Sequence, residues 1–281
     1  MKWTPKLDGE FNGNPCKIRV GYSEIKYLND INYKDCVGKV CKSKSSGDFK
    51  IVKYNNKTNV EIRFLNTGYE AVVQLGHIRN GNVKDPYLPS VHGVGISGAK
   101  YPIKVNGVIT KEYALWQSMM QRCYSDTYQK RYPTYIDCKC SENFKSYEYF
   151  YEWCHKQIGF GVEGFELDKD LLTKGNKVYS ENTCVFIPTE INTLLIKCTT
   201  SRGKYLISVY WDKNGKAFKA QVNKGKGKRE HLGLFKTEIE AFNAYKQARE
   251  SFIKEQAKKW KDKIDVRAYE ALMNYEVNVN D

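Results

Sequence analysis

The chain has 281 residues, with 46 Lys and Arg against 32 Asp and Glu, and a formal net charge of +14. This basic balance favours a polyanionic partner such as nucleic acid. No apolar run approaches the roughly 18 residues needed to span a bilayer, and residues 1–13 lack the apolar segment of a signal peptide. We therefore expect a cytoplasmic protein that has no membrane partner and an α+β fold of several modules.

The N-terminal region has the pattern of a small β module. Residues 49–54, 60–64 and 69–73 are strand-like, and Asn-rich and Gly-containing turns separate them. We expect a small twisted sheet of SH3-like type within residues 1–98, which ends in a Pro- and Gly-rich stretch at 86–98. Its basic side chains could form a nucleic-acid face, and a structural or protein-interaction role is an equal alternative; these side chains are Lys53, Arg63, Arg79 and Lys84.

The middle region, residues 99–198, is where catalytic chemistry would have to lie. Apolar spacing predicts helices over residues 113–124 and 146–155. A strand around residues 167–170, a glycine turn at Gly175-Asn176, a second strand-like run over 179–186 and a helix over 188–196 follow. The predicted order is therefore strand, loop, strand, helix.

This order resembles the ββα unit of HNH nucleases, and Asp168, Asn182 and Asn192 match the pattern of that family in order and approximate spacing. In such a site one divalent cation stabilises charge on the scissile phosphate. The resemblance implies that Asp168 and Asn192 bind Mg²⁺ or Mn²⁺, and that Asn182 orients the attacking group.

The residue after Asp168 departs from the HNH pattern, because Lys169 stands where the family has a histidine. An ordinary lysine is protonated at neutral pH and cannot act as a general base. Asp170 or Lys169 would then occupy the place of the base, or His155 would enter from elsewhere in the fold. The alternative for the acids and Asn182 is a turn held by carboxylate and amide hydrogen bonds.

The nine cysteines are scattered and include no CxxC pair. Structural zinc sites usually pair ligands two to four residues apart. Cys138 and Cys140 could both face one metal from a strand, but the pattern favours reduced, buried thiols over zinc ligands.

Residues 199–263 predict a three-stranded sheet and a helix. The strands are expected at 209–211, 218–222 and 231–235, and a capping box of Thr237 and Glu240 starts the helix. Phe218, Ala220 and Val222 should face the helix, together with Val209, Leu232 and Leu234. The opposite face should then carry base-reading side chains; these are Tyr210, Lys219, Gln221, Asn223, Arg229 and His231.

Charge is concentrated in this region. Residues 213–229 contain seven Lys and Arg and no acid, which suits phosphate contacts, and the loops supply Lys213, Lys226 and Lys228. The sheet and its alanine-lined helix resemble an AP2-type DNA-binding module. Residues 264–281 add a helix that we expect to pack on the body of the protein.

Together the modules resemble phage-encoded HNH endonuclease-like proteins with a C-terminal AP2-type domain. The leading hypothesis is a DNA-binding, metal-dependent endonuclease that acts on double-stranded DNA. The alternative is a catalytically inactive phage factor that occupies DNA or binds a host protein or nucleoprotein complex, for example a host-defence inhibitor such as an anti-CRISPR.

Overall fold

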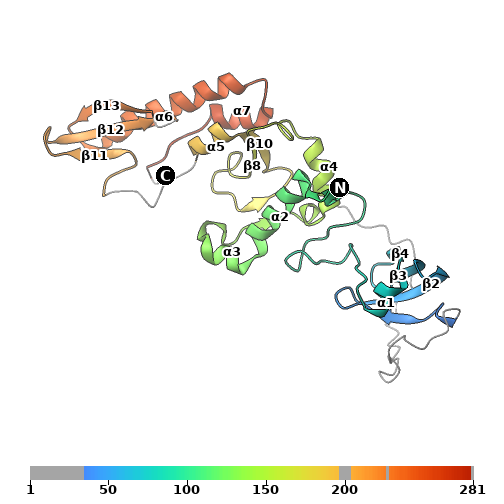
Figure 1. Ribbon diagram of the computed structural model, residues 1–281. Helices are drawn as coiled ribbons and strands as arrows, with labels where there is room; N and C mark the ends of the chain where they lie inside the picture. The colour runs from blue at the N-terminus through green and yellow to red at the C-terminus, as the bar shows by residue number, and fades with distance from the viewer. Residues whose placement is uncertain (1–34, 196–203, 226–227, 280–281) are drawn as a thin grey trace, which may run out of the picture. The chain divides into compact units, whose positions relative to one another are not determined.

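The computed structural model describes residues 35–195, 204–225 and 228–279. They form a mixed α+β structure that contains five small sheets, so the expected fold class is confirmed at this level (Figure 1). The chain divides into two compact units, one up to residue 102 with residues 145–148, and one of residues 103–144 with residues from 149 onward. No helix in the described ranges is long and apolar enough to cross a membrane.

The first unit is built on an antiparallel sheet whose strand order, β1-β2-β3-β4, follows the chain. Its core consists of alternate strand residues, among them Phe49, Ile51 and Ile62, which are fully buried. Leu75 and Ile78 of the short helix that follows complete this core. The elements are β1 Val40–Lys42, β2 Asp48–Asn56, β3 Asn59–Phe64, β4 Glu70–Val73 and α1 Leu75–Arg79.

The second unit begins with a hairpin and an aromatic core. The indole of the buried Trp116 donates a hydrogen bond to the carbonyl of Phe144 at 2.8 Å, and Phe144 packs edge-on against Phe150. The predicted helices are present, with starts shifted by one or two residues. The elements are β5 Lys104–Val105, β6 Val108–Ile109, α2 Lys111–Tyr124, α3 Asp126–Arg131, β7 Lys139–Cys140 and α4 Tyr147–His155.

A strand pair and a helix follow in the predicted order. Strand β8 (Phe165–Asp168) pairs antiparallel with β10 (Val185–Pro188), and helix α5 (Thr189–Leu195) comes next. The strand-like run over residues 179–186 was expected to form one strand, but the structure divides it. Its start belongs to β9 (Val178–Tyr179), which pairs in parallel with β7, and a turn at 181–183 separates β9 from β10.

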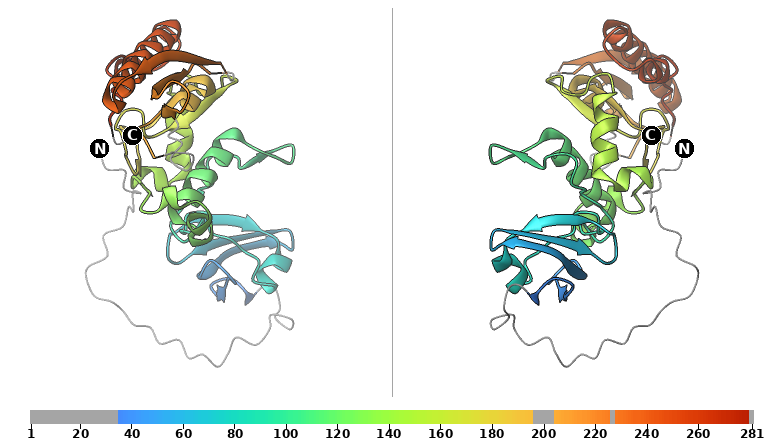
Figure 2. Two further views of the ribbon diagram at one scale, coloured as in Figure 1. Left: turned by 90° about the vertical axis from the view of Figure 1, so that its left-hand side faces the viewer. Right: turned by 90° about the vertical axis from the view of Figure 1, so that its right-hand side faces the viewer.

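The C-terminal sheet has the predicted three antiparallel strands, β11 (Val209–Asp212), β12 (Ala217–Asn223) and β13 (Arg229–Phe235). Helix α6 (Glu238–Trp260) lies along one face of this sheet (Figure 2). The predicted capping box is present, because the Thr237 hydroxyl accepts from the Glu240 amide and the Glu240 carboxylate accepts from the Thr237 amide.

Helix α6 takes part in two hydrophobic cores. Near its start, Ala241, Phe242 and Tyr245 are buried under the sheet. Further along, Ile253 and Ala257 are buried in a second core with residues of β10, α5 and the last helix, α7 (Val266–Met273); these are Val185, Ile187, Ile191, Ala268 and Leu272. One continuous helix therefore joins the sheet to the ββα unit, and α7 packs on the body as expected.

Polar contacts of α6 reinforce this junction. The Arg249 guanidinium donates to the carbonyl of Asn223 on β12 at 2.7 Å, and it also donates to the carbonyl of Leu194 on α5. The Lys259 ammonium forms an ion pair with Glu190 of α5 at 2.8 Å. Arg249 lies on α6 between the two groups of buried residues. Its side chain therefore connects the C-terminal sheet with α5.

We expect Ile253→Ala to lower the free energy of unfolding by about 2–5 kcal/mol, because it removes methyl and methylene groups from a packed core. Urea denaturation measures this change. Ile239→Ala on the same helix is a matched control, since Ile239 is 51% exposed and its truncation should cost less than about 0.5 kcal/mol. Similar losses in both variants would contradict the second core.

Candidate functional site

The outer face of the C-terminal sheet carries the polar side chains that alternation had placed there. Strand pairing sets Tyr210 opposite Lys219, Gln221 opposite His231, and Asn223 opposite Arg229. Residues directly opposite in an antiparallel pair share one face of the sheet. On the other face, Ala220 and Val222 are fully buried against α6. The face prediction for the six polar residues is therefore confirmed.

Leu234 is an exception, and its predicted inward position was wrong. It pairs with Lys219 and is 50% exposed on the outer face. The strand pairing shifts at Ala220, where β13 contributes an extra residue and Gly233 has a φ of 132°. A β-bulge of this kind changes the alternation, so Leu232 and Phe235 face the helix, whereas Leu234 does not.

The loops at the ends of these strands carry the other predicted basic residues. Lys213 lies in the turn after β11, whose backbone amides donate to the Asp212 carboxylate. Lys228 lies immediately before β13, and Lys226 is outside the described residues. Lys224 forms an ion pair with Glu230, and this partner raises the pKa of the Lys224 ammonium. One of the lysines in the basic run is therefore neutralised locally.

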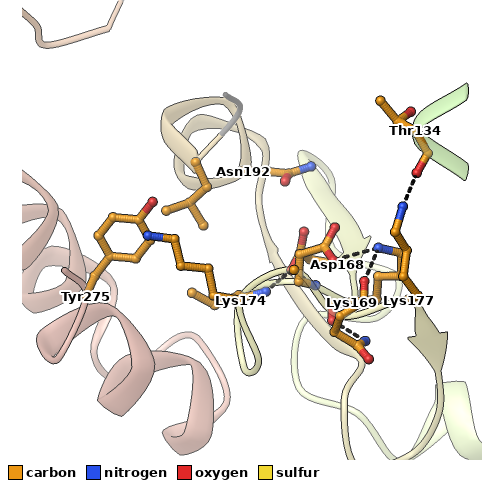
Figure 3. A pocket seen from close by; sticks show the side chains of 12 residues that line it. Thr134, Asp168, Lys169, Lys174, Lys177, Asn192 and Tyr275 are labelled. Atoms are coloured by element: carbon orange, nitrogen blue, oxygen red, sulfur yellow. Dashed lines mark hydrogen bonds and ion pairs between the residues drawn. The ribbon is translucent and has the colours of Figure 1, made fainter. Parts of the chain in front are cut away.

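The ββα unit forms a pocket of about 320 Å³ that brings together residues from four segments (Figure 3). Asp168 at the end of β8 and Asn192 on α5 both line it. That the two bind one metal ion, as the HNH resemblance implies, stays a prediction. The remaining walls come from the loop after β8, from a 3₁₀ turn and from the segment after α7; they include Lys169, Asp170, Lys174, Lys177, Thr134 and Tyr275.

Asp168 makes the hydrogen bonds of a carboxylate-capped turn. Its Oδ1 accepts from the amides of Asp170 and Leu171 at 2.9 and 2.7 Å. Burial raises the pKa of this carboxyl group more than the two amide bonds lower it. The turn that was the alternative reading of these acids is therefore present, and it positions Asp168 at the pocket.

Lys169 is buried and ion-paired. Its ammonium lies 2.6 Å from the Asp170 carboxylate, donates to the carbonyl of Asn176 at 2.8 Å, and stands over the Tyr179 ring. Only a protonated amine makes such an ion pair, and a protonated amine has no lone pair to accept a proton. This arrangement fits a structural cation better than a general base.

Asn182 and His155 do not line the pocket. Asn182 is exposed in the turn between β9 and β10. The His155 ring lies 2.9 Å from the Glu112 carboxylate of α2 and packs beside Tyr151 and Phe160. The candidate base from outside the ββα unit is therefore held in a contact between α4 and α2.

Glu166 is a candidate that sequence reasoning missed. It precedes Asp168 by two residues on β8, so both side chains belong to one face of the strand. The Asn192 amide donates to the Glu166 carboxylate at 2.7 Å, which links α5 to β8 beside Asp168. The period-two spacing of the two acids was a local signal that could have identified Glu166.

The possible metal ligands near the pocket are few. In the described part of the chain, no group of three or more His, Cys, Asp and Glu residues is placed to hold a metal ion. Asp168 and Asn192 would supply two oxygens, and Mg²⁺ commonly completes such a set with water and phosphate oxygens. The residues therefore fit a sparsely ligated Mg²⁺ or Mn²⁺ site at most.

The described cysteines of the second compact unit are buried thiols. Burial raises the pKa of Cys123, Cys138 and Cys184. Zinc binds the thiolate form, so a raised pKa works against metal binding at these positions.

No protein-family model, curated protein or solved structure matches this chain. Its function must therefore be inferred from the residues themselves.

The raised pKa of Asp168 predicts a pH-dependent stability. The folded protein holds this proton more tightly than the unfolded chain, so ionisation of Asp168 lowers stability as pH rises through the unfolded and then the folded pKa. We expect Asp168→Asn to raise the free energy of unfolding above the folded pKa and to have little effect at lower pH, because the amide oxygen can still accept both backbone bonds. Chemical denaturation over a pH series measures this.

Asp265→Asn is the matched control with the opposite sign. The Arg267 guanidinium lowers the pKa of Asp265, so its carboxylate stabilises the fold above the unfolded pKa, and this contribution is lost as pH falls through the folded pKa. The substitution should therefore destabilise the protein at neutral pH. A destabilised Asp168→Asn variant at neutral pH would contradict the burial of that carboxyl group.

Proposed function

We propose that this protein binds double-stranded DNA through the outer face of the β11–β13 sheet. The observation that carries the proposal is the row of cross-strand polar pairs on that face, Lys219 with Tyr210, Gln221 with His231 and Asn223 with Arg229. Helix α6 covers the opposite face of the sheet. Of the two faces of the sheet, the outer one is therefore the one that a partner can reach.

The chemistry of these side chains suits DNA. The major groove is wide enough to admit a small β-structure, and Arg, Lys, Asn and Gln hydrogen-bond to base edges there. Between residues 200 and 263 the sequence has 17 Lys and Arg against 7 Asp and Glu, hence a net charge of +10. This excess favours phosphate contacts with release of counterions. An AP2-type reading module remains our proposal for this region.

Metal-dependent cleavage of the phosphodiester backbone is a second candidate function. The observation that favours it is the cluster of Asp168, Glu166 and Asn192 on β8 and α5, which resembles the oxygen-rich site of an HNH nuclease. When bound there, a divalent cation would stabilise charge on a phosphate. The chain itself would contribute Asp168 and Asn192 as ligands and Glu166 as the group that orients Asn192.

The general base is the weak point of this second candidate. The pocket is lined by no histidine among the described residues, and Lys169 is ion-paired with Asp170. Asp170 is the one expected substitute that both lines the pocket and has an exposed side chain, at 52%. DNA binding without cleavage therefore has the stronger support. An SH3-like N-terminal module and a host-protein partner remain predictions.

We expect the double charge reversal Lys219→Glu/Arg229→Glu to reduce duplex affinity at least tenfold, because it places negative charge where the groove and phosphates would lie. Fluorescence anisotropy with a labelled duplex at constant salt measures the affinity. Lys254→Glu/Lys258→Glu is a control with the same charge change on α6, which packs on the opposite face of the sheet. Equal losses in both variants would indicate unspecific attraction and contradict a reading face.

We expect the wild-type protein to bind supercoiled plasmid and leave it uncut in Mg²⁺ or Mn²⁺, because the pocket offers no evident base. Agarose gel electrophoresis separates nicked from supercoiled DNA. Nicking that is lost in both Asp168→Ala and Glu166→Gln would favour the second candidate instead. Nicking that survives both substitutions would show that the pocket is not the site of cleavage.

A further inference from the structure

One row of side chains on the outer face of the C-terminal sheet combines basic and apolar groups. Lys219 of the central strand, β12, pairs with Tyr210 of β11 and with Leu234 of β13. Side chains directly opposite one another in antiparallel strands lie on one face, with their Cβ atoms about 5 Å apart. The three residues therefore form one row across the sheet, with the lysine in the middle.

The outer members of this row present apolar surface to solvent. Tyr210 is 51% exposed and Leu234 is 50% exposed. Lys219 between them is half-buried, as is usual for a lysine whose stem lies along apolar neighbours while its ammonium group reaches water. No hydrogen bond or ion pair joins this ammonium group to another residue of the described ranges. Its donors are therefore available to a ligand at this face.

The outward position of Leu234 is set by the backbone. The bulge that shifts the strand pairing at Ala220 places Leu234 on the outer face, whereas unbroken alternation would turn it toward α6. Leu234 also lies close to the turn between β11 and β12, because a Cβ atom on Gly215 would come within 3.1 Å of its Cδ1 atom. A glycine in that turn leaves room for the leucine, which is held at a defined place and remains half exposed.

The chemistry of this row matches the edge of thymine in the major groove. Thymine presents its O4 acceptor beside a C5-methyl group there, and none of the other three bases has a methyl group. A lysine ammonium only donates, and Leu234 offers an apolar contact beside it. Cytosine, the other pyrimidine, presents an amino donor at this position, which a lysine cannot accept.

We propose that this row selects thymine in duplex DNA, with Leu234 contacting the methyl group and Lys219 donating to O4. Tyr210 borders the lysine on its other side. The proposal rests on the duplex binding proposed above and adds the base that this row reads. It also gives the β-bulge a role in recognition, because the bulge brings the apolar side chain to the reading face.

Replacement of thymine by uracil tests the methyl contact, since uracil lacks only the methyl group and the protein is left unchanged. The wild-type protein first selects a duplex from a random pool, and each thymine of that duplex is then replaced in turn by deoxyuridine. We expect at least one replacement to weaken binding about fourfold, which corresponds to the burial of one methyl-sized group. Leu234→Ala should bind the thymine and uracil duplexes equally. Fluorescence anisotropy at constant salt measures both affinities.

Two further variants separate the methyl contact from other effects. Ile239→Ala is the matched control, because it removes an apolar side chain of similar exposure, 51%, from α6. This control should keep the full difference between thymine and uracil. Lys219→Met removes the donor and keeps an apolar stem, so it should weaken binding to both duplexes and preserve their ratio.

Equal binding of the thymine and uracil duplexes by the wild-type protein at every position would overturn thymine selection. An undiminished difference in Leu234→Ala, or duplex binding without enrichment of any sequence, would overturn it as well. Each of these results is compatible with duplex binding that still depends on Lys219 and Arg229. A wild-type protein that binds no duplex would overturn the proposed function too, so the two failures are distinguishable.

Discussion

Helix α6 is long because two cores share it. Ala241, Phe242 and Tyr245 complete the core under the C-terminal sheet, and Ile253 and Ala257 enter the core of the ββα unit. Each core is small, and a small set of strands needs a covering element to bury its apolar face. Since one continuous helix supplies that cover to both, neither the sheet nor the ββα unit can lose α6 without exposing part of its core.

This sharing has a consequence for function. The candidate reading face and the pocket of Asp168 depend on the same helix, which Arg249 also connects to Asn223 and Leu194 through backbone carbonyls. Contacts with DNA at one surface would therefore constrain where the other can bind.

Much of the fold could be predicted because its signals are local. The capping box at Thr237 depends on two residues three positions apart, and the burial of Ala220 and Val222 follows from strand alternation. The prediction failed at Leu234 because a β-bulge near Gly233 shifted the pairing. That bulge is a property of two paired strands, and alternation within one strand does not reveal it.

For the candidate site, the sequence by itself determined the order of the ββα elements, the place of Asp168 on the first of their strands, and the polar outer face of the sheet. Only the tertiary structure decided which side chains meet. It joined Asn192 to Glu166, buried Lys169 against Asp170, held His155 against Glu112, and brought Lys174 and Lys177 to the rim of one pocket. The physical reason is that local backbone preferences fix strands and helices, whereas contacts between distant residues depend on how the packed cores place those elements.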